Sequence, residues 1–219
     1  MLAQALAAER DLESALAGRK NHMARYQAIA ATGEAIIGLL SDACAKSEFT
    51  GARFALYQPK DFESPIDEGV TLYLYRVSIN GSRRNLPPTV GPDGKRYRPP
   101  IPLDFHYVLT AWAKTAARQQ RLLGWAVRTL QDVPVLPASF LSAYAPEPDV
   151  FRPGEAVELI FDSLTLQDMN NLWGTAKIAP PLSVAYLARM IAIESDVELP
   201  DAGLPVQTRA LDMGVTKTE

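Results

Sequence analysis

Apolar residues recur at the period of an α-helix in two segments of the chain, residues 32–46 and 116–131. The repeating positions are Ala35, Ile36, Leu39, Leu40 and Ala43 in the first segment and Leu122, Leu123, Ala126, Val127 and Leu130 in the second. This spacing predicts two amphipathic helices, each with one buried face. We expect Thr32 to be the N-cap of the first helix.

Four further segments have the composition or the alternation typical of β-strands: residues 70–80, 101–113, 156–162 and 182–196. The last of them is apolar on both faces, which predicts a central position in a sheet. Residues 81–102 contain three glycines and are rich in proline, so we expect a long, partly extended loop there and no hairpin.

A third helix is predicted to start at Thr165, because Thr165 and Asp168 have the spacing of a capping box. We expect Gly174 to end this helix, and a short helical turn within residues 135–144. The order of helices and strands predicts an α+β fold, in which a single domain has a mixed sheet of about four or five strands with its flanking helices on one face.

The chain has 219 residues, which suits one domain with extensions at its ends. We expect that domain to span residues 28–196 and to be preceded by a helical arm over residues 1–27. The weak apolar stripe of the arm consists of Leu2, Leu6, Leu12 and Leu16. Residues 197–219 are expected to form a C-terminal tail without a core of its own.

Composition narrows the class of protein. The net charge of −3 gives no support to nucleic-acid binding, which usually needs a basic balance. Cys44 is the single cysteine, so no internal disulfide can form, as in proteins of reducing compartments. The N-terminus lacks the pattern of a signal peptide, and no segment has 18 consecutive apolar residues. We therefore expect a soluble cytoplasmic protein that binds neither nucleic acid nor membrane.

The strongest candidate for chemistry is the pair Asp104 and His106, which are two residues apart on a predicted strand and so point to the same side. A metal site needs at least a third ligand, and the only other histidine is His22. We expect neither a metal nor a cofactor. Two interpretations of these residues stay open. Either Asp104, His106 and Cys44 serve a small hydrolase, or the same residues have a structural role.

Charge is unevenly distributed along the chain. Residues 76–98 contain six basic residues and one acidic residue, whereas residues 147–168 contain six acidic residues and one basic residue. Residues 194–219 contain six acidic residues and two basic ones. Such segments can pair head to tail between copies of one chain, and contacts of this kind close into rings when the rotation allows. The alternative is that these charged segments make no contact between copies and are simply exposed to solvent.

Several stretches resemble the cap, or tail-terminator, proteins of contractile injection systems, which are phage-tail-like particles. The resemblance covers about residues 28–194 and rests on four segments in order: VTLYLYRVSINGSRRNLPP, DGKRYRPPIPLDFHYVLTAWA, RLLGWAVRTLQDVPVL and LTLQDMNNLWGTAKIAPPLSVAYLARMIAIES. It does not extend to residues 1–27 or to the residues after Asp196.

The resemblance implies a structural protein rather than an enzyme, with a fold similar to phage tail terminators. Such a protein would form a six-fold ring at the end of the particle distal to the baseplate, end the inner tube and hold the sheath. Asp104 and His106 would then be scaffold residues. From charge we expect the contacts with other subunits to involve Arg83, Arg84, Lys95, Arg96 and Arg98.

Two further expectations follow from this resemblance. The partners would be other copies of the chain, the inner tube subunit and the sheath subunit, and the acidic tail is a candidate for the sheath contact. Assembly would take place in the cytoplasm, within a particle that can be released from the cell. A tube or sheath adaptor subunit of the same particle is the alternative, and the position on the particle distinguishes the two.

Overall fold

The computed structural model describes residues 24–91, 93–145, 150–176 and 180–200. The main sheet has six strands in the order β1-β2-β5-β8-β7-β6. Their bounds are Arg53–Tyr57 (β1), Gly69–Ile79 (β2), Ile101–Trp112 (β5), Ser183–Ile193 (β8), Ala156–Asp162 (β7) and Val135–Pro137 (β6). β1 runs parallel to β2 and every other neighbouring pair is antiparallel, so the sheet is mixed, as predicted.

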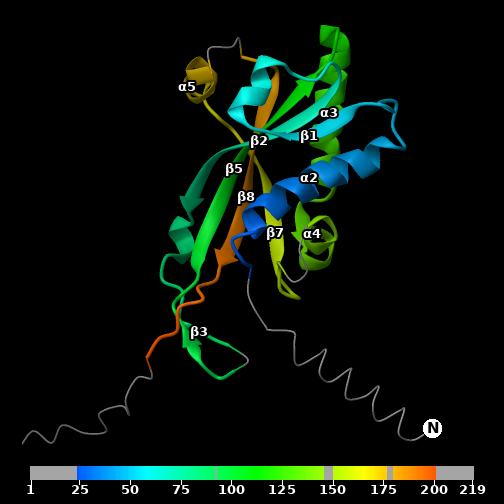
Figure 1. Cartoon of the computed structure of the whole chain (residues 1–219). Coiled ribbons are helices and arrows are strands. Elements are labelled where there is room, and N and C mark those ends of the chain that lie inside the picture. The colour runs from blue at the N-terminus through cyan, green and yellow to red at the C-terminus, as the bar shows by residue number, and fades with distance from the viewer. Residues whose placement is uncertain (1–23, 92, 146–149, 177–179, 201–219) are drawn as a thin grey trace, which may run out of the picture.

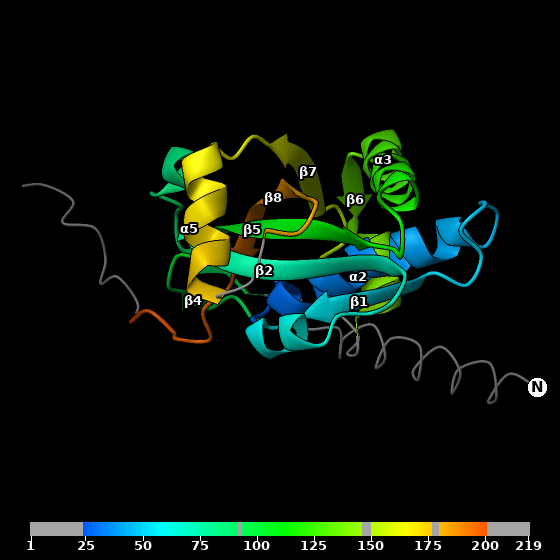
Figure 2. The ribbon, with the colours of Figure 1, turned by 90° about the horizontal axis from the view of Figure 1, so that it is seen from above.

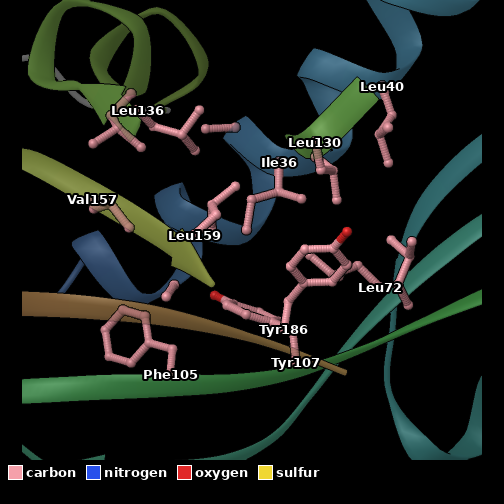
Figure 3. Packing of buried hydrophobic residues seen from close by; sticks show 14 of the residues in the cluster. Ile36, Leu40, Leu72, Phe105, Tyr107, Leu130, Leu136, Val157, Leu159 and Tyr186 are labelled. Carbon is pink, nitrogen blue, oxygen red and sulfur yellow. The ribbon is translucent and has the colours of Figure 1, made fainter. Parts of the chain in front are cut away.

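Three helices cover one face of this sheet: α2 (Ala28–Cys44), α3 (Ala116–Asp132) and α4 (Ala138–Tyr144). They enclose the main hydrophobic core, in which Ile36 of α2 and Leu130 of α3 meet Tyr107 of β5 (Figure 3). Both predicted amphipathic helices thus bury the apolar face that their spacing indicated. β8 lies between β5 and β7, which confirms its predicted central position.

A second, smaller core lies on the opposite face. There α5 (Leu166–Ala176) and the 3-10 helix η1 (Pro59–Glu63) place Trp173 and Phe62 against Val108 of β5. The view from above shows α5 across one end of β2 and β5, away from α2 and α3 (Figure 2). The expectation that the helices lie on one face is therefore wrong for α5, whose aromatic side chains find a second apolar surface on the sheet.

The first helix starts earlier than predicted. α2 begins at Ala28, so Thr32 lies inside the helix, where its buried hydroxyl donates a hydrogen bond of 2.7 Å to the carbonyl oxygen of Ala28. The prediction of Thr32 as N-cap is wrong. The cause is local: alanine is the best helix former, and Ala28 and Ala31 already belong to the buried stripe.

The α+β class is confirmed, with six strands in the main sheet rather than four or five. The two strands that the sequence pattern did not predict are the edge strands β1 and β6, which are five and three residues long. Such short segments give too few alternating positions to distinguish a strand from a loop. β6 also contains Pro137, a residue that sheets tolerate at their edges.

The segment predicted as a loop without a hairpin contains a small one. β3 (Thr89–Val90) pairs with β4 (Arg96–Tyr97) in an antiparallel ladder. The turn between them uses Gly94 at φ 75°, a conformation that glycine adopts without strain. Further along the chain, α5 begins with the predicted capping box, since the amide of Asp168 donates to the Thr165 hydroxyl, but it continues past Gly174 to Ala176.

Neither predicted extension is described in full, because residues 1–23 and 201–219 lie outside the described residues. The predicted boundaries of the arm, the domain and the tail therefore stay predictions. The chain enters the described region at Ala24, which is buried and whose carbonyl accepts from the amide of Glu194 at 3.0 Å. No helix within the described part of the chain is long and apolar enough to cross a membrane.

Candidate interaction surface

The β3–β4 hairpin is tied to the chain that follows β8. The amide of Arg98 donates to the carbonyl of Val197 at 3.0 Å, and the amide of Leu199 donates to the carbonyl of Arg96 at 2.7 Å. Residues 89–91, 93–98 and 197–199 thus form one unit, here called the hairpin unit. It extends beyond the main sheet on the side away from η1 and α5 (Figure 1).

The hairpin unit carries three of the five basic residues expected at a subunit contact. Lys95 pairs with Glu198, with 2.5 Å between the Nζ and Oε1 atoms, and this bond raises the pKa of the lysine. Tyr97 donates a hydrogen bond of 2.8 Å to Asp93, which lowers the pKa of that carboxyl. Lys95 is therefore already neutralised by its own chain, while Arg96 and Arg98 form no ion pair with another described residue.

The other two candidates lie where β2 ends. Arg83 closes the short 3-10 helix η2 (Gly81–Arg83) and Arg84 follows it. Both side chains are exposed, and neither forms an ion pair with a described residue. The four arginines of this region, Arg83, Arg84, Arg96 and Arg98, therefore present a basic surface that can accept carboxylates from a partner.

Two acidic residues of the segments predicted to meet this surface are used inside the chain. Arg152 forms an ion pair with Glu194, and its amide donates to Glu155 at 2.8 Å. Burial raises the pKa of Glu155. Of the other acidic side chains near β7 and α5, Asp168 is exposed and Glu158 is half-buried. The acidic counterpart of the basic surface is thus smaller than the charge count indicates.

Asp104 and His106 lie on the face of β5 opposite the main core. Asp104 accepts two hydrogen bonds from Asn80, at 2.9 and 3.1 Å. The Nε2 atom of His106 lies 2.8 Å from the Oγ of Ser78, and its Nδ1 lies 3.9 Å from the Oδ2 of Asp162. Burial, together with the charge of Arg76, lowers the pKa of His106. Asp104 thus ties β5 to the residue that follows β2, and His106 contacts Ser78 of β2 and lies near Asp162 of β7.

The hydrolase alternative fails on position. Cys44 is buried in the main core, where its Sγ donates to the carbonyl of Phe49 at 3.0 Å, whereas His106 projects from the other face of the sheet. Ser78, His106 and Asp162 lie next to one another in space in the sequence hydroxyl, imidazole, carboxylate, as in a catalytic triad. The distance of 3.9 Å between the histidine Nδ1 and the aspartate Oδ2 is, however, longer than a hydrogen bond. Within the described residues, no group of three or more His, Cys, Asp or Glu could hold a metal ion.

One feature near these residues was missed from the sequence. A cavity of about 590 Å³ lies between η1, α5 and the sheet, with Phe62, Tyr73 and Trp173 on its apolar side and Arg76 and Asp162 on its polar side. Its aromatic residues come from η1, β2 and α5, and Phe62 and Trp173 are more than a hundred positions apart. No local pattern in the sequence brings them together, so only the tertiary fold reveals this cavity.

Comparison with known proteins identifies the fold. The sheath/tube terminator of an extracellular contractile injection system, called PVC, in its extended state has a TM-score of 0.55 to this chain at 15% identity. The match covers 87% of this chain and 64% of that one. The tube-terminating cap of the anti-feeding prophage gives a TM-score of 0.48 at 13% identity, over 80% of this chain and 58% of that one. This chain thus spans less than two thirds of the length of either structure.

The fold is therefore of the terminator type, a mixed sheet with flanking helices. The model of the Pvc16 N-terminal domain matches residues 31–208, and the chain belongs to this family. The resemblance to cap proteins of contractile injection systems is confirmed. A search of curated proteins finds no match.

Proposed function

We propose that this chain is a structural subunit of the sheath/tube terminator cap of a contractile injection particle. The observation that carries the proposal is the family match over residues 31–208, which agrees with a terminator fold over most of the chain. In this role the protein sits at the end of the particle distal to the baseplate, ends the inner tube and holds the sheath. It needs no catalytic residue, metal or cofactor.

The cap is proposed to be a ring of this chain, with six copies. The distribution of charge supports a head-to-tail contact, because Arg83, Arg84, Arg96 and Arg98 are exposed after β2 and around β4, whereas Asp168 is exposed on α5. A contact between two different patches repeats from copy to copy and closes into a ring when the rotation between neighbours allows. Lys95 contributes little, since Glu198 already neutralises it.

The remaining partners are proposed to be the last ring of inner tube subunits and the neighbouring sheath subunits. The particle is assembled in the cytoplasm and retains the cap when it is released. An adaptor subunit placed between tube and sheath is the second candidate, since the same fold could serve either position in one particle.

Particles assembled with and without this chain test the function. If the chain terminates the tube, its absence gives tubes of variable length and sheaths that detach, whereas its return restores one length. The length distribution in electron micrographs provides the measurement. Tubes of one length in the absence of the chain would contradict the proposal. The matched control is the chain with Lys95→Gln, which should restore one length, since Lys95 is already paired with Glu198.

A further inference from the structure

A bulge in β2 shapes the cavity between η1, α5 and the sheet. The ladder with β5 pairs Leu74 with Tyr107 and then Arg76 with His106, so Tyr75 is an extra residue between the two pairs. Without this residue, Arg76 would share the core-facing side of Leu74. The bulge instead turns Arg76 to the cavity, which Tyr75 also lines. Bulges are frequent beside functional sites, where they redirect a side chain.

The aromatic side of the cavity is only partly used by the fold. Phe62 and Trp173 are buried against each other, with 5.0 Å between their ring centres. Tyr73 and Tyr75, by contrast, are half-buried and line the same cavity. Their rings therefore leave a surface that a side chain from outside can cover. The volume of about 590 Å³ lies in the range of sites that bind a ligand or a side chain.

The charges around the cavity favour a cationic occupant. Among the described residues that line it are two carboxylates, Asp162 and Asp168, and one guanidinium, that of Arg76. Burial, together with the charge of Arg76, lowers the pKa of His106, so this ring is uncharged at neutral pH. Aromatic rings beside a surplus of carboxylate suit an arginine that is accompanied by an apolar side chain.

The β3–β4 hairpin presents such a pair of side chains. Val90 of β3 is 63% exposed and is the ladder partner of Arg96 in β4. Residues directly opposite each other in an antiparallel pair lie on the same face, so the apolar side chain and the guanidinium are neighbours. Arg96 is exposed and forms no ion pair with another described residue, whereas the adjacent Lys95 is paired with Glu198.

The hairpin and the cavity are placed for a contact between copies. The hairpin unit extends beyond the main sheet on the side away from η1 and α5, the two elements that border the cavity (Figure 1). Since the hairpin points away from the cavity of its own chain, the hairpin that fits this cavity is that of a second copy. A contact between two different parts of a chain leaves one of each free and so repeats from copy to copy.

We propose that the hairpin unit of one copy docks into the cavity of the next, with Val90 against Tyr73 and Tyr75 and with Arg96 beside Asp162. The guanidinium then gains both an aromatic face and a carboxylate. This inference rests on the proposed ring, for which it names the contact between neighbouring subunits.

Charge variants of the purified full chain test the contact, with the association constant between copies measured by sedimentation equilibrium. Asn171 is exposed on α5 and lines the cavity. Arg96→Glu and Asn171→Lys should each weaken association by about tenfold, because like charges then meet at the contact. Both changes in one chain should restore association, since opposite charges meet again in each pair of neighbours.

Asn170→Lys is the matched control, because Asn170 is the exposed neighbour of Asn171 on α5 but lies outside the residues that line the cavity. This variant should associate like the wild type. Association that Asn171→Lys leaves unchanged would overturn the proposal, as would a double variant weaker than either single one or a wild-type chain that is monomeric at every concentration. These outcomes would leave the terminator role standing, because tube length in assembled particles tests that role separately.

Discussion

The Nζ atom of Lys95 lies 2.5 Å from the Oε1 atom of Glu198, a residue 103 positions further along the chain. The two side chains are 55% and 51% exposed, so the ion pair contributes little to global stability. The ion pair instead holds the β3–β4 hairpin next to the segment that follows β8. Arg96 and Arg98 are exposed and form no ion pair with another described residue.

This arrangement predicts different effects for neighbouring basic residues. The double variant Arg96→Glu and Arg98→Glu should weaken the association between subunits, because like charges then meet at the proposed contact. Lys95→Gln should leave association unchanged, since Lys95 is already paired. Native mass spectrometry of the cap bound to tubes measures the number of copies. Equal copy numbers for both variants and the wild type would argue against the basic surface as the contact.

Two glycines in helices predict opposite effects of the same substitution. A Cβ atom on Gly38 of α2 would lie 2.1 Å from the Tyr144 ring of α4, so Gly38→Ala should destabilise the fold by about 1–3 kcal/mol. A Cβ on Gly124 of α3 would meet nothing within 4 Å, so Gly124→Ala should stabilise it by about 0.5–1 kcal/mol. Urea denaturation measures both, and equal signs would refute the packing of α2 on α4.

The environment of His106 predicts a dependence of stability on pH. Burial and Arg76 lower its pKa in the folded state from the usual 6.5. As the pH falls through 6.5, the unfolded chain therefore binds a proton before the folded chain does, and the free energy of unfolding decreases. His106→Gln should remove this part of the decrease. Denaturation of both proteins at several pH values between about 5 and 7.5 tests the sign; identical slopes would show that His106 does not contribute.

Arg118 on α3 provides a test of side-chain geometry. Its Nε and Nη2 atoms donate to Glu68 at 3.0 and 2.8 Å, and its guanidinium lies 4.6 Å from the centre of the Phe49 ring. Lysine can reproduce neither the two bonds nor the stacking, so Arg118→Lys should cost about 1 kcal/mol. Arg128→Lys is the control, because Arg128 is 74% exposed in its pair with Asp132 and should change stability by less than about 0.5 kcal/mol.

The features that the sequence predicts correctly are those recorded in local patterns. β8 is apolar on both faces and is central, and the spacing of Thr165 and Asp168 marks the start of α5. The start of α2 could not be predicted from Thr32, because the alanines before it extend the helix without any capping signal. The short strand β1 lacked enough positions for a pattern.

Charge predicted which part of the chain is basic but not which residues remain available to a partner. Lys95 is paired with Glu198, and Arg152 with Glu194, through contacts between segments far apart in the sequence. Net charge over a window counts such residues as if they were solvated. The five candidate interface residues stay a prediction, in which Lys95 differs from the four arginines by its ion pair with Glu198.

The most direct test of the account is the position of this chain on the assembled particle. A labelled copy imaged by electron microscopy should appear at one end only, the end distal to the baseplate, in contact with the last ring of the tube. Label along the length of the tube, between tube and sheath, or at the baseplate would contradict the proposal that this protein is the terminator cap.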